Sequence, residues 1–125
     1  MICVLDAHVL LWWLSDDPTL VSAARASIAD PANEVIVSAA TIWELEIKRA
    51  LGKLEVPDDL LGELKVAQLD CLAVTGADAI TAARLPMHHR DPFDRMLLAQ
   101  AIRLDAVLIS RDQAFEAYGV PVMRA

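Results

Sequence analysis

Short, unbroken apolar runs that alternate with helical segments are the feature that most constrains the fold of this chain. Runs that are apolar throughout, instead of at every second position, are typical of strands buried on both faces. Strands of this kind, separated by helices, form a parallel sheet covered by helices on both faces. We therefore predict an α/β fold with four to five short parallel strands, in one domain over residues 1–125. The predicted strands cover residues 1–5, 34–38, 71–74, 106–110 and 120–123.

The helices between these strands are predicted from their end signals. Thr75 and Asp78 form a capping-box pattern, and Asp91-Pro92 places a capping residue before a proline at the first helical position. Gly52 and Gly119 are typical of helix C-termini. The predicted helices cover residues 7–14, 22–29, 39–51, 58–68, 77–85, 92–104 and 113–118, with Ser22 expected as the N-cap of the second.

Three aspartates fall at one edge of the predicted sheet. Asp6 directly follows the first strand, and Asp112 lies two residues beyond the fourth. Asp94 is in the first turn of the helix that leads into the fourth strand, on the same helical face as the apolar Leu98 and Ala101. Functional sites of open parallel sheets gather outside the carboxyl ends of the strands, where such a helix also begins. We therefore expect Asp6, Asp94 and Asp112 to lie close together.

Glu44 is the fourth acidic candidate. It falls within an apolar stripe on the predicted helix over residues 39–51, formed by Ala40, Trp43, Ile47 and Leu51. A carboxylate in an apolar stripe costs free energy unless it is paired or bound to a metal. Two interpretations are open at this point: a local ion pair with Lys48 one turn later, or membership of the acidic cluster.

The chemistry that such a cluster serves is narrow. Carboxylates without cysteine or paired histidine ligands suit hard cations, Mg²⁺ or Mn²⁺. Without a cation they would repel one another and raise one another's pKa values. A water activated by such an ion can attack a phosphodiester, and a carboxylate that is not a ligand can take the proton from that water. The pattern therefore favours metal-dependent phosphodiester hydrolysis.

Other chemistry-bearing residues give weaker signals. His88 and His89 lie in a loop beside the predicted site and are expected to be solvated, with phosphate contact as the alternative. Arg95 and Arg111 each neighbour a candidate acid, and we expect structural ion pairs more than substrate contacts. Two cysteines in apolar runs, Cys3 and Cys71, are expected to be buried free thiols. The chain has no CxxC zinc spacing, glycine-rich phosphate loop or Gly-x-Ser-x-Gly elbow.

Charge and hydropathy exclude some functional classes. The formal net charge is −7, which argues against a protein that holds nucleic acid by bulk electrostatics. The longest apolar runs, such as residues 9–14, are far shorter than the ~20 residues that span a bilayer. The N-terminal run has no basic segment before it and meets Asp6 at once, so we expect no signal peptide and a cytoplasmic protein without membrane association.

These residues, taken in order, resemble the PIN domain family, and more narrowly the VapC-type toxins of toxin–antitoxin pairs. The resemblance covers nearly the whole chain. The segments that carry it are Leu5-Asp6-Ala7-His8 with Leu11-Trp12-Trp13-Leu14, Ser38-Ala39-Ala40-Thr41-Ile42-Trp43-Glu44 with Lys48 and Leu51-Gly52-Lys53-Leu54, His89-Arg90-Asp91-Pro92-Phe93-Asp94-Arg95 with Ala99-Gln100-Ala101, and Leu108-Ile109-Ser110-Arg111-Asp112.

The resemblance implies a metal-dependent endoribonuclease that acts on RNA. It implies Asp6, Glu44, Asp94 and Asp112 as the catalytic and metal-binding acids, with Mg²⁺ or Mn²⁺ as the cofactor. It also implies a homodimer and a small antitoxin, encoded nearby, that covers the site. The chain departs from the family at Ala7, where the family usually has Thr or Ser, so a hydroxyl near the metal is missing.

Two other functions are compatible with acids at a sheet edge. One is an aspartate-based phosphoryl-transfer domain with Asp6 as the nucleophile, although His8 stands where a haloacid-type phosphatase has a second aspartate. The other is a catalytically weak binding module whose acidic pocket receives a basic segment of a partner. Loss of RNA cleavage with EDTA would exclude the binding module, and a stable phosphoryl adduct on Asp6 would favour the phosphoryl-transfer domain.

Overall fold

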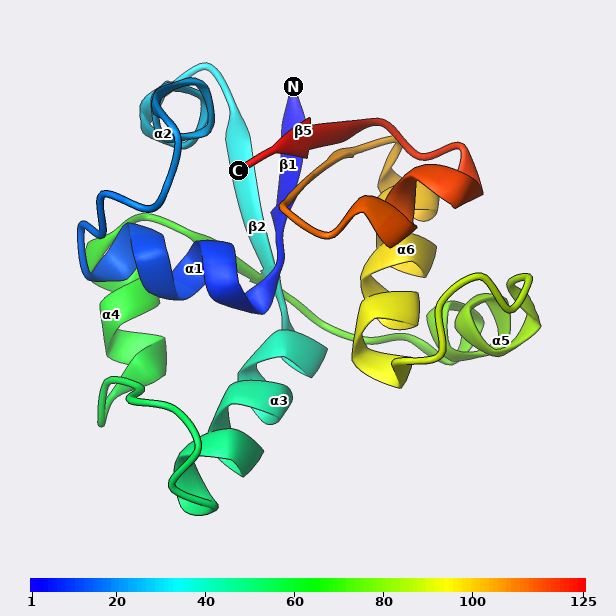
Figure 1. Cartoon of the computed structure of the whole chain (residues 1–125), viewed down its shortest axis with the longest axis horizontal. Helices are drawn as coiled ribbons and strands as arrows, with labels where there is room; N and C mark the ends of the chain where they lie inside the picture. Colours follow the sequence, from blue (N-terminus) through cyan, green and yellow to red (C-terminus); the bar gives the residue numbers. More distant parts are fainter.

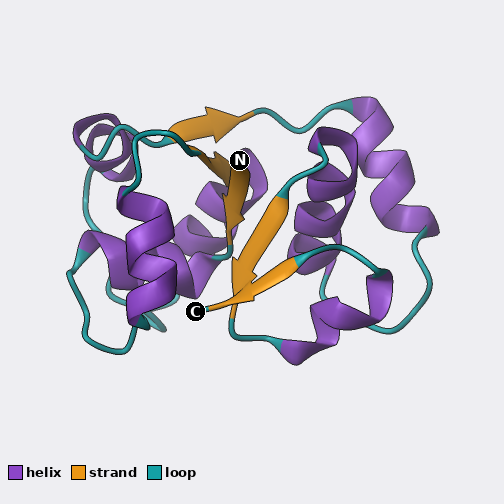
Figure 2. Cartoon of the chain, turned by 90° about the horizontal axis from the view of Figure 1, so that it is seen from above, coloured by secondary structure: helices purple, strands orange, loops and turns teal.

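A five-stranded, fully parallel sheet forms the centre of the protein, with helices on both sides (Figures 1 and 2). The computed structural model describes residues 1–125. The strand order is β3-β2-β1-β4-β5, so the first strand lies in the middle. This confirms the predicted α/β class. The strands are β1 (Ile2–Leu5), β2 (Glu34–Ser38), β3 (Asp70–Leu72), β4 (Val107–Ser110) and β5 (Val122–Arg124).

The helices divide into two groups around the sheet. Figure 1 shows α1, α2 and α4 on one side and α5 and α6 on the other, with α3 extending from the end of β2. The helices are α1 (Ala7–Leu14), α2 (Ser22–Ala29), α3 (Ala39–Ala50), α4 (Leu60–Val66), α5 (Gly76–Arg84) and α6 (Pro92–Leu104), with a 3₁₀ helix η1 (Gln113–Tyr118) before β5. None of the helices combines the length and the apolar character needed to cross a membrane.

Neighbouring residues of the central strand pack into two separate cores. Cys3 and Leu5 contribute to the core under α1, α2 and α4, whereas Val4 contributes to the core under α6 and η1. All three side chains are fully buried. Because successive side chains of a strand point to opposite faces, an apolar run is what a strand covered on both faces requires. The pattern that predicted the sheet is therefore explained by these two cores.

Element boundaries follow the predictions closely, with a few corrections. The capping box of Thr75 and Asp78 is present, and α6 begins at Pro92 behind the cap Asp91. Ser22 is the first residue of α2 and Val21 is its N-cap, so the predicted cap is wrong by one residue. Cys3 is buried as expected, but Cys71 is exposed because the edge strand β3 is not covered there.

The buried face of α3 differs from the predicted one. Trp43 and Leu51, which were expected to face the core, are 64% and 63% exposed. Ala40 of the predicted stripe is buried, and so is Glu44, but their buried neighbours on this helix are Thr41 and Leu45. The helix extends from the carboxyl edge of the sheet and packs against α1 and α6, so its burial follows these neighbours and not its own most apolar stripe.

The strand order places a topological switch point between β1 and β4. The chain leaves β1 toward β2 and β3 on one side of the sheet, then crosses to β4 and β5 on the other. The loops that follow β1 and β4 therefore diverge and leave a crevice at the carboxyl edge of the sheet, where ligands bind in open α/β folds. Asp6 and Asp112 follow these two strands.

An ion pair with a buried carboxylate joins α5 to α6. Arg103 of α6 donates hydrogen bonds to both carboxylate oxygens of Asp78, at 2.7 Å and 3.0 Å, and Asp78 is 2% exposed. The Thr75 backbone N–H and the Gln100 side chain also donate to this carboxylate. Burial alone would raise the pKa of Asp78, but these donors outweigh it and lower the pKa to about 2.

The Asp78–Arg103 pair is expected to stabilise the fold at neutral pH and to lose its effect in acid. Because the pKa of Asp78 is lower in the folded than in the unfolded chain, its contribution is complete above about pH 4 and falls as the pH drops toward 2. Asp78→Asn should therefore lower the free energy of unfolding by about 2 kcal/mol at pH 7, and by less at pH 3. Urea unfolding at the two pH values measures this.

Asp58→Asn is the matched control, because Asp58 forms an exposed ion pair with Arg49. Its substitution should change the free energy of unfolding by less than about 1 kcal/mol at either pH. An Asp78→Asn protein as stable as the parent at pH 7 would contradict the assignment.

Candidate active site

Two of the predicted acids are linked at the ends of β1 and β4. Asp6 is the N-cap of α1, and its Oδ1 accepts a hydrogen bond from the Val9 backbone N–H at 2.9 Å. Its Oδ2 accepts a hydrogen bond from the hydroxyl of Ser110, the last residue of β4. The Ser110 hydroxyl oxygen in turn accepts the backbone N–H of Asp112 at 3.0 Å. Ser110 therefore holds Asp6 and Asp112 on the same edge of the sheet.

Asp94 projects into the same crevice from the first turn of α6. The carboxylate of Asp91 caps this helix and accepts the backbone N–H groups of Phe93, at 2.8 Å, and Asp94, at 3.2 Å. Asp91 thus provides the hydrogen-bond acceptor for the free N–H groups at the start of the helix. The Asp94 side chain takes no part in the cap and lies within 3.0 Å of His89.

The His89 imidazole lies between two of the acids. Its Nε2 is 3.0 Å from Oδ2 of Asp94 and 3.0 Å from Oδ2 of Asp112. Its Nδ1 accepts a hydrogen bond from the Asp91 backbone N–H at 3.2 Å. Because Nδ1 faces a donor, the ring hydrogen is on Nε2, where it points at the carboxylates. His89 is therefore a hydrogen-bond donor inside the acidic cluster.

Glu44 forms the local ion pair with Lys48 that the sequence left open. Its Oε2 forms an ion pair with Lys48 at 2.9 Å, and the residue is 7% exposed. The hydrogen bond with Glu44 is the main cause of a raised pKa at Lys48, and the nearby carboxylates of Asp91 and Asp94 add to it. The ion pair with Lys48 therefore lies beside the acidic cluster.

The pKa values show how closely the carboxylates are crowded. Burial raises the pKa of Asp94 to about 7, and the negative charges of Asp91, Glu44 and Asp6 act in the same direction, whereas His89 opposes them. Burial also raises the pKa of Asp6, against the hydrogen bonds from Ser110 and Val9, and the charge of Asp112 raises it further. Asp6, Glu44 and Asp94 therefore lie near enough for their charges to interact, and the charge of Asp112 acts on Asp6 in the same way.

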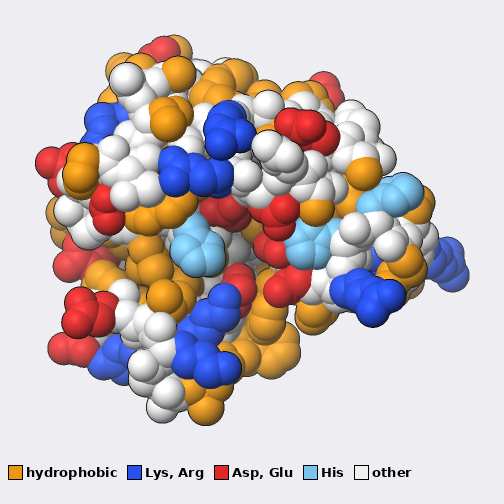
Figure 3. Space-filling view, in the orientation of Figure 1, with side chains coloured by type: hydrophobic (Ala, Val, Ile, Leu, Met, Phe, Trp, Pro, Cys, Tyr) orange, Lys and Arg blue, Asp and Glu red, His pale blue; other side chains and the backbone are white.

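The donor set of this cluster fits a hard divalent cation. Ligand atoms of Asp94, Asp112 and His89 all lie within 4.8 Å of one another. Because Nε2 of His89 carries the ring hydrogen, the two carboxylates are the candidate ligands of this group. Carboxylate oxygens are the ligands that Mg²⁺ and Mn²⁺ prefer. Figure 3 shows acidic side chains gathered around a hollow near the middle of this face, with a histidine on either side. A cation in this hollow would offset the repulsion among the acids.

Sequence reasoning underestimated His89 and Ser110. His89 was expected to be solvated, yet its side chain is only 14% exposed and contacts two acids. Its approach depends on the path of the loop that precedes α6, which follows no periodic pattern. Ser110 was expected to serve only as a cap or turn residue. Since the chain has Ala7 where the resembled family usually has a hydroxyl, Ser110 is notable as a hydroxyl donor to Asp6.

The two arginines beside the acids form no ion pair. Arg111 stacks over the Trp12 ring at 4.5 Å and donates hydrogen bonds to the backbone carbonyls of Thr19 and Ala125. Arg95 is buried and donates only to backbone carbonyl groups. The predicted ion pair is therefore wrong for Arg95, whose partners are carbonyl oxygens inside the chain, and neither arginine pairs with an acidic side chain.

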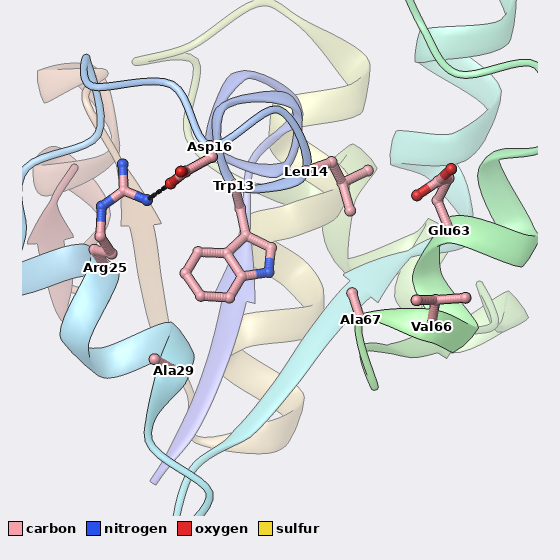
Figure 4. Close-up of a pocket in the computed structure, with 8 residues that line it drawn as sticks. All are labelled: Trp13, Leu14, Asp16, Arg25, Ala29, Glu63, Val66 and Ala67. Atoms are coloured by element: carbon pink, nitrogen blue, oxygen red, sulfur yellow. Dashed lines mark hydrogen bonds and ion pairs between the residues drawn. The ribbon is translucent and has the colours of Figure 1, made fainter.

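A separate apolar groove lies between α1, α2 and α4 (Figure 4). Trp13 and Leu14 of α1 line it together with Ala29, Val66 and Ala67, and an ion pair between Asp16 and Arg25 lies at its rim with a length of 2.6 Å. Its volume is about 540 Å³. Trp12, on the other side of α1, lies under Arg111. The two tryptophans thus face different surroundings, as the nearly all-apolar sequence of α1 required.

Comparisons with known proteins identify similar chains. Residues 3–121 match the model of the PIN domain. The chain is 28% identical over 121 residues to Ribonuclease VapC22 of Mycobacterium tuberculosis, with 94% of this chain and 92% of that protein covered.

Solved structures with the same fold cover almost all of the chain. VapBC2 from Rickettsia felis, bound to a DNA fragment from its promoter, has a TM-score of 0.72 at 13% identity, covering 99% of this chain and 98% of that one. FitAcB from Neisseria gonorrhoeae has a TM-score of 0.68 at 21% identity, covering 98% and 96%. VapBC-5 from Mycobacterium tuberculosis has a TM-score of 0.63 at 22% identity, covering 99% and 98%. At these identities the likeness establishes the fold.

The crowding predicts that Asp94 destabilises the metal-free protein as it ionises. Because its pKa is raised from 3.8 to about 7 on folding, the folded state holds this proton more tightly, and stability is lost as the pH rises through 7. Asp94→Asn cannot ionise, so in EDTA it should be more stable than the parent at pH 8, by about 1 kcal/mol or more, and similar at pH 4. Thermal unfolding at both pH values measures the difference.

Asp30→Asn, which removes an exposed acid far from the cluster in the loop between α2 and β2, should show no such pH-dependent gain. An Asp94→Asn protein that gains no stability between pH 4 and pH 8 would show that the acids are not crowded.

Proposed function

The chain belongs to the PIN domain family, and from this premise we propose that it is a metal-dependent endoribonuclease, the toxin of a toxin–antitoxin pair. The observation that carries the proposal is the convergence of four acids from four different elements at the β1/β4 switch point. Such an arrangement lowers the stability of the metal-free protein and therefore needs a reason in function. The similarity to Ribonuclease VapC22 supports RNA as the substrate.

In this proposal the acids bind one or two hard cations, Mg²⁺ or Mn²⁺. Asp6, Asp94 and Asp112 provide ligand oxygens from the ends of β1 and β4 and the start of α6, and Glu44 completes the acidic set from α3. When bound, the ion supplies an activated water nucleophile and offsets negative charge on the phosphate oxygens. Lys48 is held beside Glu44 and keeps a positive charge at the edge of the pocket.

Two apolar surfaces of this protein are evidence that it binds other chains. The groove between α1, α2 and α4 has the apolar lining that suits a segment of a partner, and we propose a small antitoxin encoded nearby. The similar fold of VapBC-5, a member of the VapBC family of toxin–antitoxin systems, supports this choice. On the other side of the site, the 64% exposed Trp43 packs edge-on against Phe93, with ring centres 5.3 Å apart. This exposed aromatic pair supports a homodimer.

We place the protein in the cytoplasm, where RNA is available to it.

Substitution of single acids tests the proposed catalytic set. Asp6→Asn and Asp94→Asn should each lower the rate of RNA cleavage in Mg²⁺ or Mn²⁺ by about 100-fold or more, because loss of a group that only supports a metal ligand already costs about 10- to 100-fold. EDTA should abolish cleavage by the parent, and excess Mn²⁺ should restore it. Gel assays of a cellular RNA pool measure the rates.

The Asp30→Asn protein controls for the change of charge and should cleave at the rate of the parent. Cleavage by Asp6→Asn and Asp94→Asn at the parent rate would refute the assignment of the site. A parent that cleaves RNA equally well in EDTA would refute the metal dependence.

Co-expression tests the proposed partner. The product of the neighbouring small gene should co-purify with this chain. The purified complex should cleave RNA at least about tenfold more slowly than the free chain, because a partner that extends from the groove over the crevice would keep RNA from the acids. Separate purification in denaturant and refolding of this chain should restore activity. A complex as active as the free chain would contradict the antitoxin assignment.

A further inference from the structure

Arg95 is a buried cation whose partners are all backbone carbonyls. It lies in the first turn of α6, is 6% exposed and forms no ion pair, although Asp91 and Asp94 are its neighbours in sequence. Its three nitrogens donate five hydrogen bonds, 2.6 to 3.3 Å long, to the carbonyl oxygens of Ala82, Ala83, Leu85, Pro86 and His89. These carbonyls belong to the end of α5 and to the loop that follows it.

The chemistry of this arrangement requires arginine. The last carbonyls of a helix lack partners within the helix and carry the negative end of its dipole, so they favour a cation. A guanidinium group presents five N–H donors in a planar fork, whereas an ammonium group has three donors and no fork. Only the guanidinium group matches the five carbonyl oxygens around Arg95 in number. Lysine at this position would leave carbonyls at the end of α5 without a donor.

The same hydrogen bonds fix the backbone of His89. Its carbonyl oxygen accepts from Arg95 Nη1 at 3.1 Å, and its N–H donates to the Tyr118 hydroxyl oxygen at 2.7 Å. The Tyr118 hydroxyl donates to the Pro86 carbonyl at 2.6 Å, and Arg95 Nη1 donates to that carbonyl as well. Arg95 and Tyr118 therefore hold the loop from two sides, and no backbone polar group of His89 is free.

The contacts of Arg95 and Tyr118 with the loop also orient the His89 ring. It packs against Phe115, with ring centres 5.6 Å apart, and its Nδ1 accepts from the Asp91 N–H. With the backbone and one face fixed, Nε2 lies 3.0 Å from the carboxylates of both Asp94 and Asp112. An imidazole in this place keeps the two carboxylates close together and oriented toward the same point.

We infer that Arg95 is a positioning residue that acts through His89: it holds the loop that keeps the imidazole between Asp94 and Asp112, and so sets the geometry of the acidic cluster. Arg95 itself contacts neither acid side chain. The predicted effect on RNA cleavage rests on the proposed function, whereas the predicted effect on the His89 ring does not. Arg103, two turns later on the same helix, pairs with the buried carboxylate of Asp78 outside the site and gives a control arginine.

A double-mutant cycle tests whether Arg95 acts through His89. Arg95→Lys should lower RNA cleavage about tenfold when His89 is present, and less than about twofold in the His89→Ala background, because residues that act as one unit are not additive. Arg103→Lys should lower it by the same small factor in both backgrounds. Equal effects of Arg95→Lys in both backgrounds would overturn the inference.

Imidazole NMR of the metal-free full-length protein gives the readout that does not depend on activity. In the parent, ¹⁵N–¹H correlation should show His89 with its hydrogen on Nε2, and His89→Ala assigns the signals. Arg95→Lys should shift His89 toward a mixture of tautomers, while His8, which is exposed on α1, stays unchanged as an internal reference. A folded Arg95→Lys protein with unchanged His89 signals would overturn the inference. A parent without RNA cleavage would refute the proposed function alone, because the NMR result would still decide the role of Arg95.

Tyr118→Phe keeps the test open if Arg95→Lys does not fold. It removes the hydroxyl that accepts from His89 and donates to Pro86, and it leaves the aromatic ring in place. It should change the same His89 signals and couple to His89→Ala in the same way. Unchanged His89 signals in Tyr118→Phe would show that the loop does not depend on these contacts, which would also overturn the inference.

Discussion

Electrostatic repulsion among carboxylates at the carboxyl edge of β1 and β4 is the constraint around which the local structure is arranged. Burial and neighbouring charges together bring the pKa of Asp94 to about 7. Every nearby polar contact reduces this repulsion: Ser110 donates to Asp6, His89 donates to Asp94 and Asp112, and Lys48 pairs with Glu44. A fold stabilised by only about 5–15 kcal/mol keeps such crowding where function requires it.

The α5–α6 pair shows two different solutions for a buried charge. Near the C-terminal end of α6, Arg103 meets the carboxylate of Asp78, and the pair joins the two helices. At the N-terminal end of α6, Arg95 meets carbonyl oxygens only, and it joins the end of α5 to the loop that carries His89. One arginine therefore contributes to the packing of the helices and the other to the shape of the site. This difference cannot be read from residue type, because both arginines lie on the same helix.

Hydrophobic periodicity and the rules of sheet topology were enough to predict the fold and most of the site from the sequence. Unbroken apolar strands gave the parallel sheet, and strand ends then placed Asp6, Asp94 and Asp112 at one edge, as the structure has them. Glu44 was chosen on a stripe that proved to be exposed, so its burial has a different cause: α3 packs by its contacts with α1 and α6. His89 was not assigned to the cluster because its position depends on a loop held by distant residues, Arg95 and Tyr118. Such contacts leave no periodic signal.

The proposed function requires that the four acids form one site for a hard cation. Anomalous diffraction from crystals of the full-length protein soaked in Mn²⁺ tests it most directly, because the signal locates the ion without reference to activity. A strong peak is expected within coordination distance of the carboxylates of Asp6, Asp94 and Asp112. At saturating Mn²⁺, the absence of a peak there, with His89 still between Asp94 and Asp112, would contradict it.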